Sequence, residues 1–321
     1  MFRTLLALSA IASFSMLAGA TTLSMQEKTR AFEFNYEARL EGLPPGKSYR
    51  LWMPVPQELP EQQQVTDVTE KLPGRITVEQ RFGNRMLYVE GKADEKGQVI
   101  CSTDYRIIRR EVTSGRTLPS SIEREMFLQP DKLVPIEGKP LTLISGKQLP
   151  GDRMQLARAL YDVVNSHMKY SKEGTGWGRG DSNWACDSKF GNCTDFHSLF
   201  ISLSRAQKMP AKFEIGFSLP DARGAGDIAG YHCWAFFQPD KNRGWVPVDI
   251  SEANKNPKLT EYYFGNLNEN RLTMSTGRDL MLEPAQAGLP LNFFIYPYAE
   301  IDGKPLAAEK IKRVVKFKDV E

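Results

Sequence analysis

Hydrophobic and polar residues alternate through the first third of the chain, a pattern typical of half-buried β-strands. In residues 31–40 (AFEFNYEARL), Phe32, Phe34 and Tyr36 fall on one face. Glycine, asparagine and aspartate turns separate this segment from further strand candidates. Several short strands at this spacing predict a β-sandwich-like domain over residues 27–145. The further candidates are residues 48–55, 75–80, 85–90 and 99–108.

The periodicity changes near residue 150. Residues 113–150 are interrupted by five prolines, which is typical of a connector. Residues 152–170 then carry apolar side chains at helical spacing, which predicts an amphipathic helix with Asp152 as its N-cap. We therefore place a second domain over residues 150–275 and a C-terminal β extension over 276–321.

The first twenty residues, MFRTLLALSAIASFSMLAGA, have the organisation of a secretory signal peptide. Arg3 supplies the positive start, residues 5–17 are mostly apolar, and residues 18–20 (Ala-Gly-Ala) form a small-x-small cleavage site. The apolar run is too short for a membrane span. The chain is therefore expected to be secreted, in the periplasm, with no membrane span after cleavage. The alternative is a retained N-terminal anchor.

Composition narrows the function classes. The chain has 321 residues, of which 41% are hydrophobic and 25% charged, as in ordinary globular proteins. Its net charge of +3 and the lack of a basic stripe give no indication of a nucleic-acid partner. An oxidising compartment would allow a disulfide among the four cysteines, with Cys186 and Cys233 as one candidate pair, but the sequence leaves Cys101, Cys186 and Cys233 without a defined connectivity.

Cys193 stands where a helix is predicted to begin. In residues 191–195 (GNCTD), Asn192 can cap the helix and Asp195 can complete a capping-box-like pair. A helix N-terminus stabilises an anion, so a thiol placed there has a lowered pKa and becomes a usable nucleophile. The alternative is that Cys193 is only a small buried hydrophobic residue.

A β-hairpin brings a histidine and an aspartate together. Residues 232–238 (HCWAFFQ) and 245–250 (WVPVDI) are predicted strands around the turn at 239–244. Symmetry about residues 240 and 241 places Asp249 directly opposite His232, on the same face of the sheet. Such a pair supplies the base and its orienting acid for a cysteine nucleophile. A structural His–Asp pair is the alternative.

These three segments together resemble a known family. GNCTDFHSLFISLSRAQKMPAKFEIGF, then YHCWAFF, then GWVPVDISEA are similar to the transglutaminase-like superfamily over about residues 150–255. The resemblance implies an α+β chain with a papain-like core, in which helices pack on an antiparallel sheet. It also implies thiol acyl transfer without a cofactor, with Cys193 as nucleophile, His232 as base and Asp249 as the orienting acid. Residues 269–303 also resemble bacterial exported members.

Other chemistry-bearing residues have weaker support. His197, four residues after Cys193, could compete as a base, but it lacks an evident orienting acid, so we expect a packing role. A zinc site is not favoured, because no CxxC pair occurs and alternation places His232 and Cys233 on opposite faces. The backbone amide of Cys193 is the expected oxyanion donor, with one side-chain donor from Trp177, Asn183 or Trp184.

The expected activity is attack on peptide or protein amide bonds through a thioester that water resolves, with cell-wall peptides as one candidate substrate. A transglutaminase that uses an amine instead of water would employ the same three residues. A third reading is a non-catalytic binding module on the same fold, because fold alone does not define function. No EF-hand-like calcium loop is present in the sequence.

Overall fold

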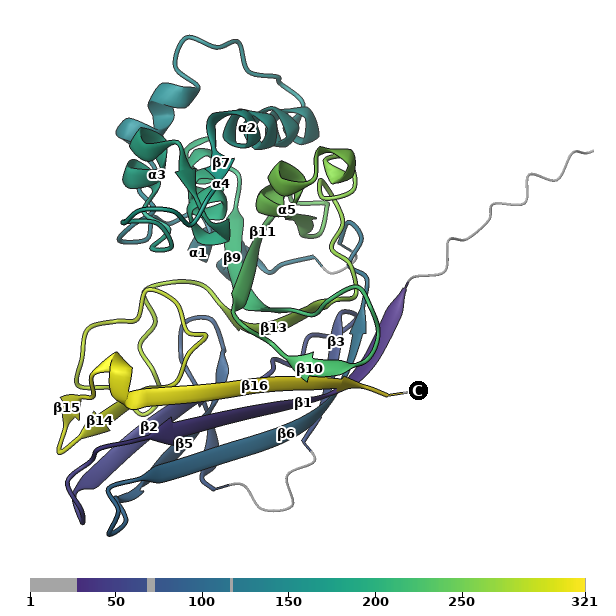
Figure 1. The fold of residues 1–321 in the computed structure, drawn as a ribbon. Helices are drawn as coiled ribbons and strands as arrows, with labels where there is room; N and C mark the ends of the chain where they lie inside the picture. Colours follow the sequence, from purple (N-terminus) through teal and green to yellow (C-terminus); the bar gives the residue numbers. More distant parts are fainter. Residues whose placement is uncertain (1–27, 68–72, 116–117, 321) are drawn as a thin grey trace, which may run out of the picture.

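The computed structural model describes residues 28–67, 73–115 and 118–320, so the predicted signal peptide lies outside the described residues. Two five-stranded antiparallel sheets form one body (Figure 1). One has the order β10-β16-β1-β6-β3, and the other has the order β15-β14-β2-β5-β4. Six of these strands come from the N-terminal part: β1 (Thr29–Leu40), β2 (Ser48–Pro54), β3 (Gln63–Asp67), β4 (Arg75–Val78), β5 (Arg85–Lys92) and β6 (Val99–Arg110).

The predicted alternation is realised in β1, where Phe32, Phe34 and Tyr36 are fully buried. They belong to the same hydrophobic core as Leu51 and Met53 of β2, so the two sheets bury their inner faces together. Five of the six strands match predicted segments. β3 was not predicted, because its sequence QQVTD carries a single apolar residue.

The C-terminal part of the chain adds strands to both sheets. These are β14 (Tyr298–Ile301), β15 (Lys304–Pro305) and β16 (Ile311–Asp319). β16 pairs with β1 along its whole length, from Phe32 opposite Asp319 to Leu40 opposite Ile311. The short β10 (Ala225–Asp227) pairs with the other edge of β16, and thereby ties the middle of the chain to the sandwich.

The middle of the chain folds around a four-stranded antiparallel sheet of order β12-β11-β9-β13. Its helices gather above the sandwich in Figure 1. The chain is therefore α+β, with helices on an antiparallel sheet, as predicted. The strands of this sheet are β9 (Ala211–Ser218), β11 (Tyr231–Phe237), β12 (Val246–Val248) and β13 (Arg271–Thr276), and a separate parallel pair consists of β7 (Lys169–Tyr170) and β8 (Phe190–Gly191). The helices are α1 (Ser121–Met126), α2 (Arg153–His167), α3 (Ser182–Ser188), α4 (Cys193–Ala206) and α5 (Ile250–Lys255). Short 3₁₀ turns occur at Lys139–Leu143, Pro257–Leu259 and Ala308–Lys310.

Two helices show how sequence and packing set their limits. α2 starts as predicted, with the Asp152 carboxylate accepting a hydrogen bond from the Gln155 amide at 2.9 Å. It ends three residues earlier than predicted, because the chain becomes extended to form β7. α4 is buried on all sides from Cys193 to Arg205, so it is a central helix and not one with a single inward face.

Within the described ranges, no helix is both long and apolar enough to cross a membrane.

Candidate functional site

Cys193 is the first residue of α4, and local hydrogen bonds fix its position. The Asn192 side chain accepts from the Thr194 amide at 3.0 Å, and the Asp195 carboxylate accepts from the Asn192 amide at 2.9 Å. This is the predicted capping box. A side chain at Gly191 would collide with the Asp195 carboxylate, because its Cβ would lie 2.4 Å from Oδ2. The glycine before the cap is therefore required by close packing.

Asp195 also holds the preceding loop against the helix start. Its carboxylate accepts hydrogen bonds from the Gly178 amide at 2.7 Å and the Gly180 amide at 2.9 Å. The Arg278 side chain donates to the carbonyls of Arg179 and Gly180. The loop that ends at Gly180 is thus tied from two sides, next to the nucleophile candidate.

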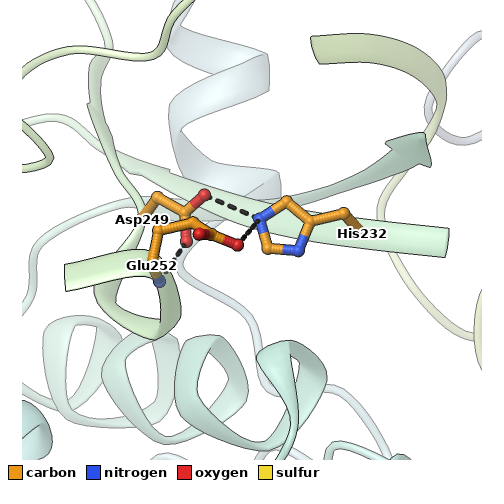
Figure 2. Close-up of side chains that lie close together, drawn as sticks. All are labelled: His232, Asp249 and Glu252. Atoms are coloured by element: carbon orange, nitrogen blue, oxygen red, sulfur yellow. Dashed lines mark hydrogen bonds and ion pairs between the residues drawn. The ribbon is translucent and has the colours of Figure 1, made fainter. Parts of the chain in front are cut away.

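His232 and Asp249 are in direct contact. The Nε2 atom of His232 lies 2.7 Å from Oδ2 of Asp249, and both side chains are buried. Figure 2 shows that this nitrogen faces Asp249 and Glu252, while the other ring nitrogen points away from both carboxylates. Glu252 Oε1 is 3.7 Å from the same Nε2 atom. The imidazole is therefore oriented through one nitrogen, and the second remains for another partner.

The contact does not arise from the predicted pairing. The observed register places Phe236 opposite Pro247, which shifts the hairpin by two residues from the predicted one, and Asp249 lies beyond the end of β12. Its carboxylate caps α5 by accepting from the Glu252 amide at 3.1 Å. A shift of two residues keeps side chains on the same face, so His232 meets Asp249 diagonally instead of directly across.

A buried arginine that the sequence analysis missed completes the pair. Arg271 of β13 is 2% exposed, and its Nη2 atom donates to Oδ2 of Asp249 at 2.9 Å. Ser251 Oγ donates to the other carboxylate oxygen at 3.0 Å. Nothing in RLTMST distinguishes this arginine from a solvent-exposed one, because its partner is 22 positions away.

The electrostatics of the three side chains are coupled. Burial raises the pKa of the Cys193 thiol, but hydrogen bonding by Cys233 and His232 and the imidazolium charge bring that pKa well below its usual range. Burial lowers the pKa of His232, whereas the charge and hydrogen bond of Asp249 and the bond with Cys193 raise it, to about 9 overall. Both shifts favour a thiolate on Cys193 next to an imidazolium on His232.

Asp249 is the fixed charge of this arrangement. Burial alone would raise its pKa, but the cations His232 and Arg271 hold the pKa of the carboxyl well below its usual range. Asp249 therefore stays ionised and keeps the imidazolium in place.

His197 is buried and accepts a hydrogen bond at Nε2 from the Ile250 amide, at 3.1 Å. Its Nδ1 atom lies 3.6 Å from Cys233 Sγ. Burial lowers the pKa of His197, which agrees with a neutral ring that accepts at Nε2. The residue joins α4 to the start of α5, in agreement with the predicted packing role.

All four cysteines are free and buried, so the candidate pair Cys186–Cys233 is not formed. Cys186 Sγ instead lies 3.7 Å from the Lys139 carbonyl. Among the described residues, His232, Asp249 and Glu252 form one group that could hold a cation, with ligand atoms within 4.8 Å of one another. Each carboxylate already contacts a cation, Arg271 or Lys255, with which a metal would have to compete.

Of the three predicted oxyanion side chains, Trp177 is engaged elsewhere. The Trp177 indole donates to the Gly174 carbonyl at 3.1 Å. Asn183 is exposed on α3, and the Trp184 ring packs edge-on against Phe190 with centroids 5.3 Å apart.

The fold and the site define a class of protein: α+β, with a cysteine at the start of a central helix and a His–Asp pair on the adjoining sheet. Residues 144–250 match the model of the transglutaminase-like superfamily, so this segment is similar to the core domain of that superfamily. The segment runs from the end of the connector through α2, α3, α4, β9, β11 and β12 to the first residue of α5, and it does not include β13 of the sheet.

Two of the proteins to which this chain is similar match more than nine tenths of it. A protein of Haemophilus influenzae, itself described as uncharacterized, is 24% identical over 364 aligned positions, covering 94% of this chain and 95% of its own length. A solved structure from Cytophaga hutchinsonii, titled a "putative cysteine protease", has a TM-score of 0.53 at 16% identity, covering 92% of this chain and 93% of its own. The periplasmic domain of TgpA from Pseudomonas aeruginosa has a TM-score of 0.40 at 16% identity, covering 71% and 90%.

Proposed function

We propose that the protein is an exported cysteine enzyme that cleaves or deamidates peptide or protein amides through a thioester. The observation that carries this proposal is the buried Cys193 thiol, which interacts with a His232 ring oriented by Asp249. Cys193 would be the nucleophile, His232 the acid and base, and Asp249 the orienting carboxylate. The protease description of the Cytophaga hutchinsonii structure is consistent with peptide substrates.

The chemistry follows from the charge distribution. The Cys193 thiolate adds to the amide carbonyl carbon, and the carbonyl electron pair moves to the oxygen. As the tetrahedral intermediate collapses, the His232 imidazolium donates its proton to the departing amine, which leaves a thioester on Cys193. Neutral His232 then takes a proton from water, which attacks the thioester and releases a carboxylic acid, so that the Cys193 thiolate and the His232 imidazolium are restored.

Export rests on the signal-peptide pattern of residues 1–20, and we place the mature protein in the periplasm. Peptides of the cell wall and exported proteins are the substrates present there. Amine-accepting transglutaminase activity is the second candidate, since an amine could resolve the same thioester.

The proposal is tested by incubating the mature protein and its Cys193→Ala variant with a panel of glutamine-containing peptides, with and without a primary amine. We expect the wild type to produce deamidated or cleaved peptide in both conditions, as read by mass spectrometry. An amine adduct as the main product would favour the transglutaminase. Identical behaviour of the two proteins across the panel would instead favour a binding module.

A bell-shaped pH dependence is expected for kcat/KM. On the acid side, activity falls when Cys193 becomes protonated, at a pH well below the ordinary thiol value of 9.0, because its pKa is lowered. On the alkaline side, activity falls near pH 9, where His232 loses the proton that the leaving group needs. The rate of iodoacetamide alkylation of Cys193 against pH measures the thiolate separately. If the alkylation rate rose only near pH 9, the thiol would have its ordinary pKa, and this would contradict an ion pair between Cys193 and His232.

A further inference from the structure

We propose that the hydroxyl of Tyr231 is the side-chain donor of the oxyanion hole, together with the backbone amide of Cys193. Tyr231 immediately precedes His232 at the start of β11. This inference rests on the proposed function, because an oxyanion forms only if Cys193 attacks a carbonyl group.

The hydroxyl lies beside the first turn of α4. Its oxygen accepts a hydrogen bond from Asn192 Nδ2 at 2.9 Å, and the hydroxyl also interacts with the Thr194 side chain. Asn192 and Thr194 are the neighbours of Cys193 on either side. The Cys193 amide belongs to the first turn, whose amides have no acceptor within their own helix. A carbonyl oxygen bound at this turn would thus be near both donors.

The hydroxyl proton of Tyr231 has neutral acceptors beside it, the Gly178 carbonyl and the Thr194 hydroxyl oxygen. Because Asn192 donates to the oxygen, the proton must point to a different acceptor, and the Gly178 carbonyl lies 3.5 Å away. That distance is well beyond the 2.5–3.0 Å typical of hydroxyl donors. A developing oxyanion would offer a charged acceptor, which is stronger than the neutral Gly178 carbonyl and the neutral Thr194 hydroxyl oxygen.

The hydroxyl also remains protonated during turnover. Burial raises the pKa of Tyr231, and the nearby Cys193 and Cys233 sulfurs raise it further. A neutral hydroxyl that stays a donor next to a thiolate is what stabilisation of an oxyanion requires.

The aromatic ring is held in place by a different part of the chain. Tyr231 packs against Phe293 and Tyr296, each with ring centroids 5.8 Å apart, in the segment that leads into β14. A donor fixed in this way does not need to reorganise during the reaction, which is the condition for effective electrostatic stabilisation. A surface tyrosine would lack this constraint.

The test uses p-nitrophenyl acetate, whose acyl group can acylate Cys193 and whose p-nitrophenolate leaves with a visible absorbance. The Tyr231→Phe variant keeps the ring and its packing and loses only the hydroxyl. We expect its acylation rate to fall by about 10²-fold, the loss typical for one oxyanion donor. Alkylation of Cys193 by iodoacetamide passes through no oxyanion, so its rate should change little. The matched control is Tyr296→Phe, which removes a neighbouring hydroxyl and should leave both rates close to wild type.

A second measurement uses N-acetylglycinal, an aldehyde to whose carbonyl carbon the Cys193 thiol adds reversibly to give a tetrahedral adduct. Its affinity should weaken in Tyr231→Phe by a factor similar to the loss in acylation. Equal losses in acylation and alkylation would show a structural role for the hydroxyl and overturn the inference. Faster alkylation with unchanged acylation would show that Tyr231 only shields the thiol, which would also overturn the inference. Unchanged rates of both reactions would overturn it as well. If the wild type does not exceed Cys193→Ala, the proposed function itself fails.

Discussion

Variants Cys193→Ala and His232→Ala are expected to lose kcat/KM to the same residual level, about 10⁵–10⁶ below wild type, with no further loss in the double variant. The reason is that the thiolate and the imidazolium form one ion pair, so either substitution removes the function of both. The measurement is kcat/KM for the best peptide of the panel, for wild type, both single variants and the double variant.

The matched control for this experiment is Cys101→Ala. Cys101 is 1% exposed on β6 in the sandwich, so the substitution makes the same chemical change in a buried position away from α4. Its activity should stay at the wild-type level. Losses that multiply in the double variant would mean that Cys193 and His232 act independently, which the proposed mechanism does not allow.

Replacing Arg271 with methionine is expected to lower the free energy of unfolding by about 3–5 kcal/mol at pH 6, the usual cost of breaking a buried ion pair. Asp249 is fully buried, and its Oδ2 atom is shared between Arg271 and His232. Without the guanidinium, one buried carboxylate loses a charge-assisted hydrogen bond. Urea unfolding of the wild type and the variant measures the difference.

The pKa shifts of Asp249 and His232 determine how the free energy of unfolding changes with pH. The folded pKa of Asp249 is lowered, so its contribution is complete above the unfolded value of about 3.9 and is lost as pH falls through the folded pKa. The folded pKa of His232 is raised to about 9, so its contribution is complete below the unfolded value of about 6.5 and is lost as pH rises through 9. In Arg271→Met, the folded pKa of Asp249 should move up towards the unfolded value, so the loss of stability on acidification should be smaller than in the wild type.

Two further variants make the stability prediction specific. Arg243→Met removes an exposed arginine that is 3.4 Å from Asp240, and it should change stability by no more than about 1 kcal/mol. The double variant Asp249→Asn/Arg271→Met removes both charges and should recover part of the loss. A full loss in the double variant would assign the destabilisation to packing around Arg271 and not to the uncompensated carboxylate.

The N-terminal strands and α2 could be predicted because their signals are local. Period-two alternation identified β1, and an aspartate at the N-cap identified the start of α2. The joining of both ends of the chain in one sandwich could not be predicted, since β16 pairs with β1 across most of the sequence. Strand pairing of this kind depends on which faces remain to be buried after the whole chain has folded.

The same difference between local and long-range signals applies to the candidate site. The capping box at Asn192 and Asp195 is local, so the sequence was sufficient to place Cys193 at a helix start. The hairpin prediction had the correct face and the wrong register. Paired positions sum to 483 and not to the 481 of a turn centred on residues 240 and 241, and alternation cannot distinguish two registers that differ by two residues. The His232–Asp249 contact was therefore expected for a partly incorrect reason.

The sequence by itself determined most N-terminal strands, the start of α2 and the helix-start cysteine, because each depends on neighbours within about one helical turn or one strand. The α+β class was implied by the family resemblance. Only the tertiary structure decided the thiol's partners, the buried Arg271 beside Asp249 and the placement of Tyr231 beside Asn192. Those contacts join residues from separate elements, and their electrostatic effect exists only where packing removes water and brings the charges together.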